Sequence, residues 1–150
     1  MTTLTVNIPR ADLLNANDRP GHWGVRYGRS LTLRGLGWAI ARSQAYGARH
    51  ERCRLTVTIT YPPLARRRDA SNLAPTIKCL VDGVADAGLL PQDDDTVIVA
   101  TTYQASAEKG VVGVWRFELE FTEAAHGTTD AEAARHVAAS KHGTVTVGRP

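Results

Sequence analysis

Two groups of acidic residues, one directly after a run of arginines, are the side chains of this sequence best suited to chemistry. Asp69 follows the arginine run 66–68 and precedes Ser71 and Asn72, and the acidic triplet 93–95 comes before an apolar segment. Carboxylates that a fold brings together repel one another and favour a divalent cation such as Mg2+, which prefers oxygen ligands. Arginines beside such a site would hold phosphates. The pattern therefore indicates metal-assisted cleavage of a phosphodiester.

Charge is divided unevenly along the chain. Residues 1–68 contain 12 Arg and three acidic side chains, whereas residues 69–150 contain six basic and 12 acidic ones. Fifteen of the 18 basic residues are Arg, whose forked guanidinium group suits phosphate. A nucleic-acid partner is therefore favoured, although a GC-rich genome that encodes Arg in place of Lys would give the same composition.

Length and composition predict one domain over residues 1–123 and a flexible tail over 124–150, which is rich in Ala, Thr and Gly. Cys53 and Cys79 have neither zinc nor disulfide spacing, so we expect reduced thiols in a cytoplasmic protein. No segment approaches the ~18 apolar residues that span a bilayer, and no membrane partner is expected.

Apolar periodicity predicts an α+β fold, a mostly antiparallel sheet of about four strands with two helices on one face. The region 10–30, which has turn formers, arginines and aromatics but no period, is expected to be a loop that grips a polyanion or a disordered connector. The expected regular elements are a strand over 4–8, a helix over 30–48, a strand over 54–61, a helix over 72–87, and an antiparallel hairpin of strands 96–104 and 111–121.

The order of motifs after residue 65 resembles a known family. An arginine run leads into Asp-x-x-Asn-Leu, a helix with Lys78 and Asp82, and then the segment 88–94 before a strand. This order resembles the RusA family of Holliday junction resolvases, small dimeric Mg2+-dependent endonucleases of bacteria and their phages. The resemblance is most specific over residues 66–99.

The resemblance implies that Asp69 and Asp94 bind the metal and act in catalysis with Lys78, and that Asp93 or Asp82 assists at the metal. Ser71 stands where the family has its second aspartate, so two carboxylates would meet only the minimum for one cation. Asp94 reaches Asp69 only if the loop after the helix runs straight back along it. Otherwise Asp82 or the other subunit of a dimer completes the site.

The resemblance also implies a DNA substrate, the four-way junction, and a homodimer whose two-fold symmetry matches that of the junction. Mg2+ is the expected cofactor, and Mn2+ could replace it. The expected location is the cytoplasm, that of the bacterial host if a phage encodes the protein. The residues expected to bind DNA are Arg66, Arg67, Arg68, Asn72, Arg19, Arg26 and Arg29.

Simpler interpretations stay open at each position. Asp69 could cap the helix, and Lys78 with Asp82 could be a solvated ion pair. The triplet 93–95 could be a polar turn. For the whole protein, the alternatives are a module that binds branched DNA without cutting it, a broader nuclease acting on flaps or forks, and a domain stabilised by Ca2+.

Overall fold

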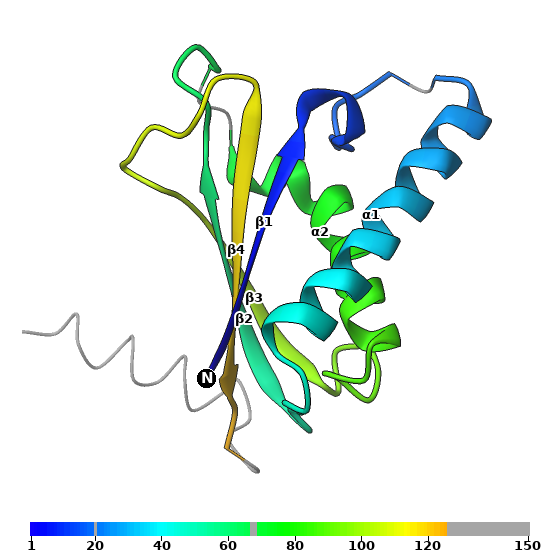
Figure 1. Ribbon diagram of the computed structural model, residues 1–150, viewed down its shortest axis with the longest axis vertical. Coiled ribbons are helices and arrows are strands. Elements are labelled where there is room, and N and C mark those ends of the chain that lie inside the picture. Colours follow the sequence, from blue (N-terminus) through cyan, green and yellow to red (C-terminus); the bar gives the residue numbers. More distant parts are fainter. Residues whose placement is uncertain (20, 67–68, 126–150) are drawn as a thin grey trace, which may run out of the picture.

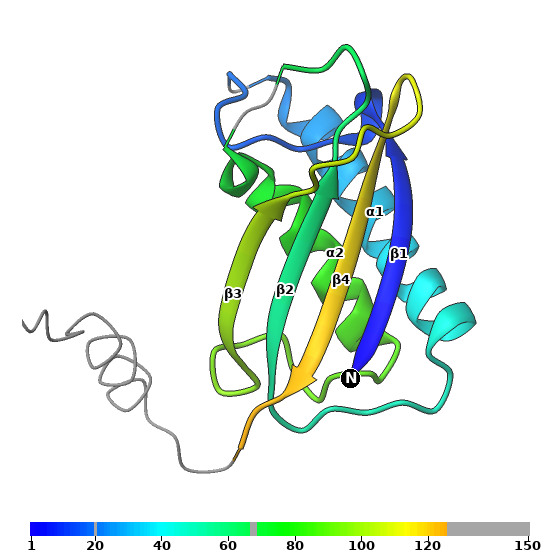
Figure 2. The same ribbon diagram turned by 90° about the vertical axis from the view of Figure 1, so that its left-hand side faces the viewer.

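The computed structural model describes residues 1–19, 21–66 and 69–125. Two helices cover one face of a four-stranded sheet whose strand order is β1-β4-β2-β3 (Figures 1 and 2). The predicted α+β fold is therefore confirmed. Nearly all of the predicted tail, residues 126–150, lies outside the described residues. The elements are β1 (Thr2–Pro9), η1 (Arg10–Asp12), α1 (Trp23–Gln44), β2 (Cys53–Thr60), η2 (Ala70–Leu73), α2 (Ala74–Asp86), β3 (Ile98–Ala105) and β4 (Val114–Glu123).

The core lies between the sheet and the helices because alternate strand residues point toward α1 and α2. In β2, the residues Leu55, Val57 and Ile59 are buried, while the intervening Thr56 and Thr58 are half-buried on the other face. The largest fully buried side chains are Phe117, Phe121, Leu4, Ile8, Leu33, Leu55, Ile59, Ile77, Leu80, Leu90, Leu119 and Val57.

The predicted hairpin of the last two strands is wrong. β3 pairs in parallel with β2 at the edge of the sheet, and β4 lies between β1 and β2, antiparallel to both. Parallel neighbours require a crossover, which α2 provides between β2 and β3. The burial of Phe117, Leu119 and Phe121 suits the central position of β4, whereas β3 exposes Thr102 and Gln104, as an edge strand can.

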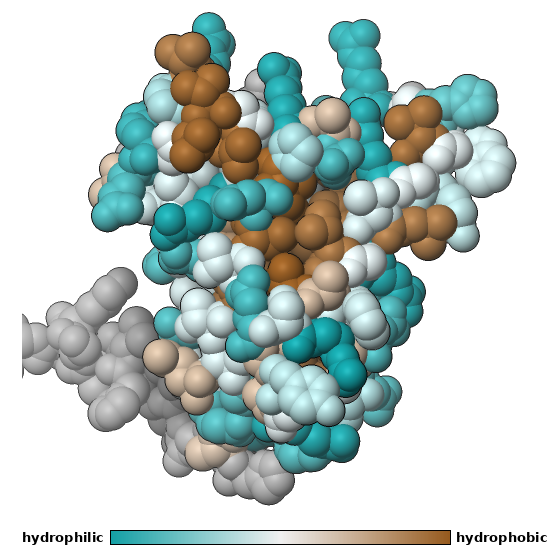
Figure 3. All heavy atoms as spheres, viewed as in Figure 1, coloured by the Kyte–Doolittle hydropathy of each residue, from teal (hydrophilic) through white to brown (hydrophobic). Residues whose placement is uncertain are grey.

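The predicted loop over 10–30 is wrong for its last part, because α1 begins at Trp23. Residues 21–28 are all exposed, so their side chains carry no apolar period that would reveal a helix. Figure 3 shows apolar surface between α1 and the strands, with hydrophilic side chains around it. The large exposed apolar side chains on α1 are Trp23, Val25, Tyr27, Leu31 and Trp38.

Two glycines allow α1 and α2 to cross closely. A Cβ at Gly37 would lie 2.0 Å from the carbonyl oxygen of Leu80, and a Cβ at Gly83 would lie 1.9 Å from that of Arg34. Neither position has room for a side chain. Gly37, which weakens the helix prediction by propensity alone, is therefore explained by packing.

The ends of the sheet carry different connections. The segments that follow β1 and β2 and the one between β3 and β4 gather at one end, together with the start of α2 (Figure 2). The loop between α2 and β3 lies at the other end (Figure 2). None of the described helices has the length and apolar character needed to cross a membrane.

Candidate functional site

A pocket of about 890 Å³ opens at the end of the sheet where β1 and β2 finish. Its buried lining is apolar or aromatic, and Trp115 adds a half-buried indole. Three guanidinium groups, two carboxylates and two amides surround this lining. The buried lining residues are Leu13, Tyr61, Pro62 and Leu73. The polar residues are Arg10, Arg29, Arg66, Asp18, Asp69, Asn15 and Asn72.

Hydrogen bonds fix two walls of this pocket to each other. The fully buried Thr76 donates its hydroxyl to the Leu14 carbonyl oxygen at 2.7 Å and accepts from the Leu14 N–H at 2.8 Å. Nearby, the Ala16 N–H donates to the Asn72 carbonyl oxygen at 2.8 Å. Hydrogen bonds within the protein therefore attach the loop after η1 to η2 and to the start of α2.

Asp69, a predicted metal ligand, lies in this pocket and caps η2. Its Oδ1 accepts from the Ser71 N–H at 3.0 Å. The hydrogen bonds from the backbone and hydroxyl of Ser71 lower the pKa of Asp69. The capping role that the sequence left open is thus present, and it occupies one carboxylate oxygen.

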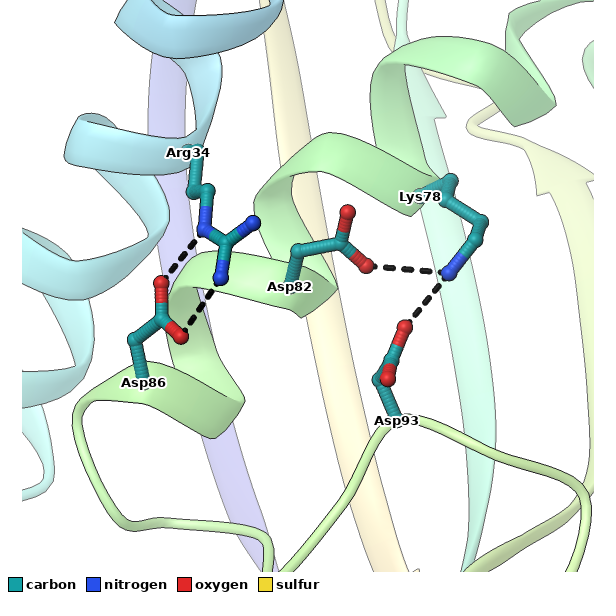
Figure 4. A network of polar contacts seen from close by, with 5 residues as sticks. All are labelled: Arg34, Lys78, Asp82, Asp86 and Asp93. Carbon is teal, nitrogen blue, oxygen red and sulfur yellow. Dashed lines mark hydrogen bonds and ion pairs between the residues drawn. The ribbon is translucent and has the colours of Figure 1, made fainter.

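Lys78, Asp82 and Asp93 form a second group of polar side chains (Figure 4). The Lys78 Nζ lies 3.0 Å from Asp82 Oδ1 and 2.5 Å from Asp93 Oδ2. Lys78 and Asp82 share a face of α2 because they are four residues apart. Asp93 arrives from the loop after the helix. The path of that loop, rather than the helix, completes the group, which we call the ionic cluster.

The two carboxylates of the ionic cluster have opposite pKa shifts. Burial and the neighbouring Asp93 raise the pKa of Asp82. Hydrogen bonds with Asp82 and Lys78 lower the pKa of Asp93 to about 2. The same two carboxylates raise the pKa of Lys78. A proton taken up by the cluster therefore goes to Asp82 first, while Asp93 stays ionised.

An ion pair between the helices borders the ionic cluster. Arg34 of α1 donates from Nε to Asp86 Oδ2 at 2.5 Å and from Nη2 to Asp86 Oδ1 at 2.8 Å (Figure 4). Arg34, Asp86, Asp82 and Asp93 line one hollow of about 350 Å³. The forked contact attaches α1 to the last turn of α2 beside the cluster.

Asp94 has a local role in the turn before β3. Its Oδ1 accepts from the Thr96 N–H at 3.0 Å, the Thr96 hydroxyl at 2.5 Å and the Val97 N–H at 3.2 Å. These bonds lower the pKa of Asp94. Asp69 precedes η2 and α2, whereas Asp94 belongs to the loop between α2 and β3, which lies at the other end of the sheet from the start of α2 (Figure 2), and the 13 residues of α2 span about 20 Å. One chain thus brings Asp82, but not Asp69, to the acidic triplet.

The predicted DNA-binding residues are divided in space. Arg29, Arg66 and Asn72 line the pocket, while Arg19 and Arg26 are exposed outside its lining. The predicted ligands Arg67 and Arg68 lie outside the described residues.

Sequence reasoning missed Arg10, Tyr61 and Trp115 as pocket residues. The signal available was their position at strand ends, where the core gives way to loops. Tyr61 directly follows β2, and Trp115 is the second residue of β4.

The carboxylates nonetheless fit a sparsely ligated ion. Across residues 1–19, 21–66 and 69–125, no three His, Cys, Asp or Glu side chains are grouped to hold a metal. Mg2+ commonly uses one or two carboxylates and takes its other ligands from water and substrate phosphate, and the pair Asp82 and Asp93 meets that requirement. In the comparisons with known proteins, no family model and no curated protein matches this chain.

Proposed function

We propose that this protein is a Mg2+-dependent endonuclease that cuts branched DNA, in particular four-way junctions, as its resemblance to RusA resolvases implies. The convergence of Asp82 and Asp93 on one cation, Lys78, is the observation that supports this most. Two carboxylates that meet at one ammonium group repel each other, and a nearby positive charge offsets this repulsion. An ammonium group supplies that charge here, and a divalent cation can supply more of it.

Asp82 and Asp93 would hold Mg2+, or Mn2+ in its place. When bound, the ion acidifies water and neutralises charge on the phosphodiester. Asp69 and Asp94, the ligands that the resemblance implies, each use Oδ1 for bonds to Ser71 and Thr96 and do not meet Asp82 and Asp93 at Lys78.

Lys78 has a role that the ionic cluster itself suggests. Its side chain is 66% exposed, so it can turn from the carboxylates toward a bound phosphate. There the ammonium group would stabilise the negative charge that develops on the phosphate oxygens. Lys78 would therefore act as the counter-ion of the two carboxylates in the absence of a metal and as the charge stabiliser in its presence.

The arginines of the pocket would hold the flanking DNA. Arg29 and Arg66 suit phosphate oxygens, and Asn72 can bond to a phosphate or a base. A four-way junction has two-fold symmetry, so we propose a homodimer with two such sites, and the exposed apolar side chains of α1 support a contact between chains. We place this activity in the cytoplasm, that of the bacterial host if a phage encodes the protein.

Incision of a synthetic four-way junction with labelled strands tests this proposal. We expect symmetric nicks with Mg2+ or Mn2+ and none with EDTA. Asp93→Asn should lower the cleavage rate at least about 100-fold and leave junction binding intact, because it removes a ligand without removing the arginines. Asp86→Asn, which changes the neighbouring ion-paired carboxylate, is the matched control. Junction binding without incision under either metal would refute the nuclease.

A second function, binding branched DNA without cutting it, has one observation in its favour. Lys78 already compensates the only two carboxylates that meet in the ionic cluster among the described residues. If the lysine outcompetes Mg2+, the protein holds junctions and does not cut them. The incision experiment separates the two functions, since both predict binding but only one predicts nicks.

A further inference from the structure

The pocket at the end of the sheet has a composition that backbone phosphates alone do not explain. A surface that binds only duplex backbone needs exposed cations and no depth. This pocket instead is an open hollow of about 890 Å³, within the usual size range of sites for small organic ligands. Its volume and its apolar lining suit a ligand that has a ring or other apolar part as well as a charge.

The buried lining suits a planar ring. Tyr61 is 5% exposed, and the half-buried indole of Trp115 lies on the adjacent strand. Leu13 and Leu73 add aliphatic surface from the loop after η1 and from η2. A nucleobase stacks on such side chains irrespective of its identity, because every base has a π-face.

The polar lining suits the other parts of a nucleotide. Arg10, Arg29 and Arg66 outnumber Asp18 and Asp69, which leaves the lining one positive charge in excess, as a phosphate requires. Amide groups can accept or donate hydrogen bonds, and carboxylates can accept them, at the edge of a base. Cation, ring surface and polar edge groups thus occur together.

The site is also built before the ligand arrives. The hydrogen bonds between Thr76 and Leu14 are buried and uncharged, so neither salt nor pH near neutrality weakens them. A preformed pocket loses less entropy on binding than a loop that must order around its ligand.

We infer that this pocket binds one unpaired nucleotide of a DNA strand, with the base against Trp115 and the phosphate on the arginines. The inference rests on the proposed function for the source of its ligand, a strand of the DNA substrate. It extends that function by its substrate class, because flaps, forks and opened junctions offer unpaired nucleotides and an intact duplex does not.

Fluorescence anisotropy in EDTA tests the inference without cleavage. The probes are a labelled single strand of about ten thymidines and a labelled abasic strand of the same length. We expect the abasic strand to bind at least about tenfold more weakly, because stacking of one base has that effect. Trp115→Leu should abolish this preference, and Trp115→Phe should keep it. Each variant is first checked for its fold by circular dichroism.

Two further variants separate charge from stacking. Arg10→Ala should weaken binding of both strands by a similar factor, whereas Arg49→Ala, an exposed arginine outside the lining that pairs with Glu51, should change neither. Equal binding of the two strands by the unmodified protein overturns the inference, and so does a preference that survives in Trp115→Leu. Junction incision without base preference refutes the pocket alone, and base preference without incision refutes the nuclease alone.

Discussion

The pocket lies beside η2 at the start of α2 and the ionic cluster includes two residues of α2, but different forces hold the two regions together. Buried hydrogen bonds between Thr76 and the Leu14 backbone fix the pocket walls, and its charged groups remain at the rim. In the ionic cluster, Lys78 and two carboxylates hold one another. A preformed cavity selects its ligand by shape. A charge-compensated cluster instead accepts any cation that can replace the lysine, so the first region suits recognition and the second suits chemistry.

The largest effect should follow from disturbing the helix crossing that positions both regions. Gly83→Ala places a Cβ 1.9 Å from the Arg34 carbonyl oxygen, so we expect a loss of about 3 kcal/mol in the free energy of unfolding. Gly35→Ala is the matched control, because a Cβ there meets nothing within 4 Å and helix propensity rises. Urea denaturation measures both. Equal stability of the two variants would contradict the close crossing.

Thr76→Val tests the pocket selectively. It leaves the Leu14 N–H and carbonyl oxygen without their partner in a buried place, which should cost about 2 kcal/mol and weaken binding of single strands. Thr32→Val removes an exposed hydroxyl that donates to Gly28 and should have little effect. Thermal unfolding and anisotropy give the two readouts. Retention of full single-strand affinity by Thr76→Val would show that the walls need no such attachment.

Lys78→Met tests the exchange of cations in the ionic cluster. Without the ammonium group, Asp82 and Asp93 face each other uncompensated, so Mg2+ at about ten times its Kd should stabilise this variant by about 1.4 kcal/mol. The same concentration of Mg2+ should stabilise the unmodified protein less, because Lys78 competes with the ion. Differential scanning fluorimetry with and without Mg2+ measures the shift. A larger stabilisation by Mg2+ in the unmodified protein than in Lys78→Met would contradict this competition.

The smallest effect concerns pH. The raised pKa of Asp82 means that the fold favours its protonated form, so stability is gained as the pH falls through that pKa and lost as it rises. Between pH 4 and 7, the free energy of unfolding of Asp82→Asn should therefore exceed that of the unmodified protein by less than about 1 kcal/mol. Asp93 loses its contribution only as the pH falls from about 4 through its pKa of about 2.

The matching control for pH is Asp86→Asn. Its bond to Arg34 lowers the pKa of Asp86, so the stability lost in this variant should shrink as the pH falls below about 4. Urea denaturation across this range compares the two variants. Parallel curves of stability against pH for Asp82→Asn and Asp86→Asn would contradict the opposite pKa shifts of the two carboxyl groups.

The sequence predicts those parts of the fold that carry a period. Leu55, Val57 and Ile59 alternate, and the apolar stripe of α2 recurs at helical spacing, so both elements are expected correctly. Alternation within a strand does not determine which strand lies beside it, so the sequence predicts a pairing of β3 with β4, whereas β3 pairs with β2. The exposed start of α1 has no apolar periodicity, so the sequence does not predict it as a helix.

The candidate site, like the fold, has features that local sequence spacing predicts and features that it does not. The four-residue spacing of Lys78 and Asp82 predicts that they meet, because a helix fixes it. The contact of Asp93 with Lys78 depends on the path of a loop, and the presence of both Tyr61 and Trp115 in the lining of one pocket depends on sheet order. The spacing of residues along the sequence predicts neither of these two features.

The rates at which Asp93→Asn and Asp94→Asn cut the same four-way junction in Mg2+ test the central claim most directly. The two residues are neighbours in one loop, but Asp93 bonds to Lys78 while Asp94 bonds within its own turn. We predict a loss of at least about 100-fold for Asp93→Asn and of less than about tenfold for Asp94→Asn. The reverse order would contradict the assignment of the metal to the ionic cluster.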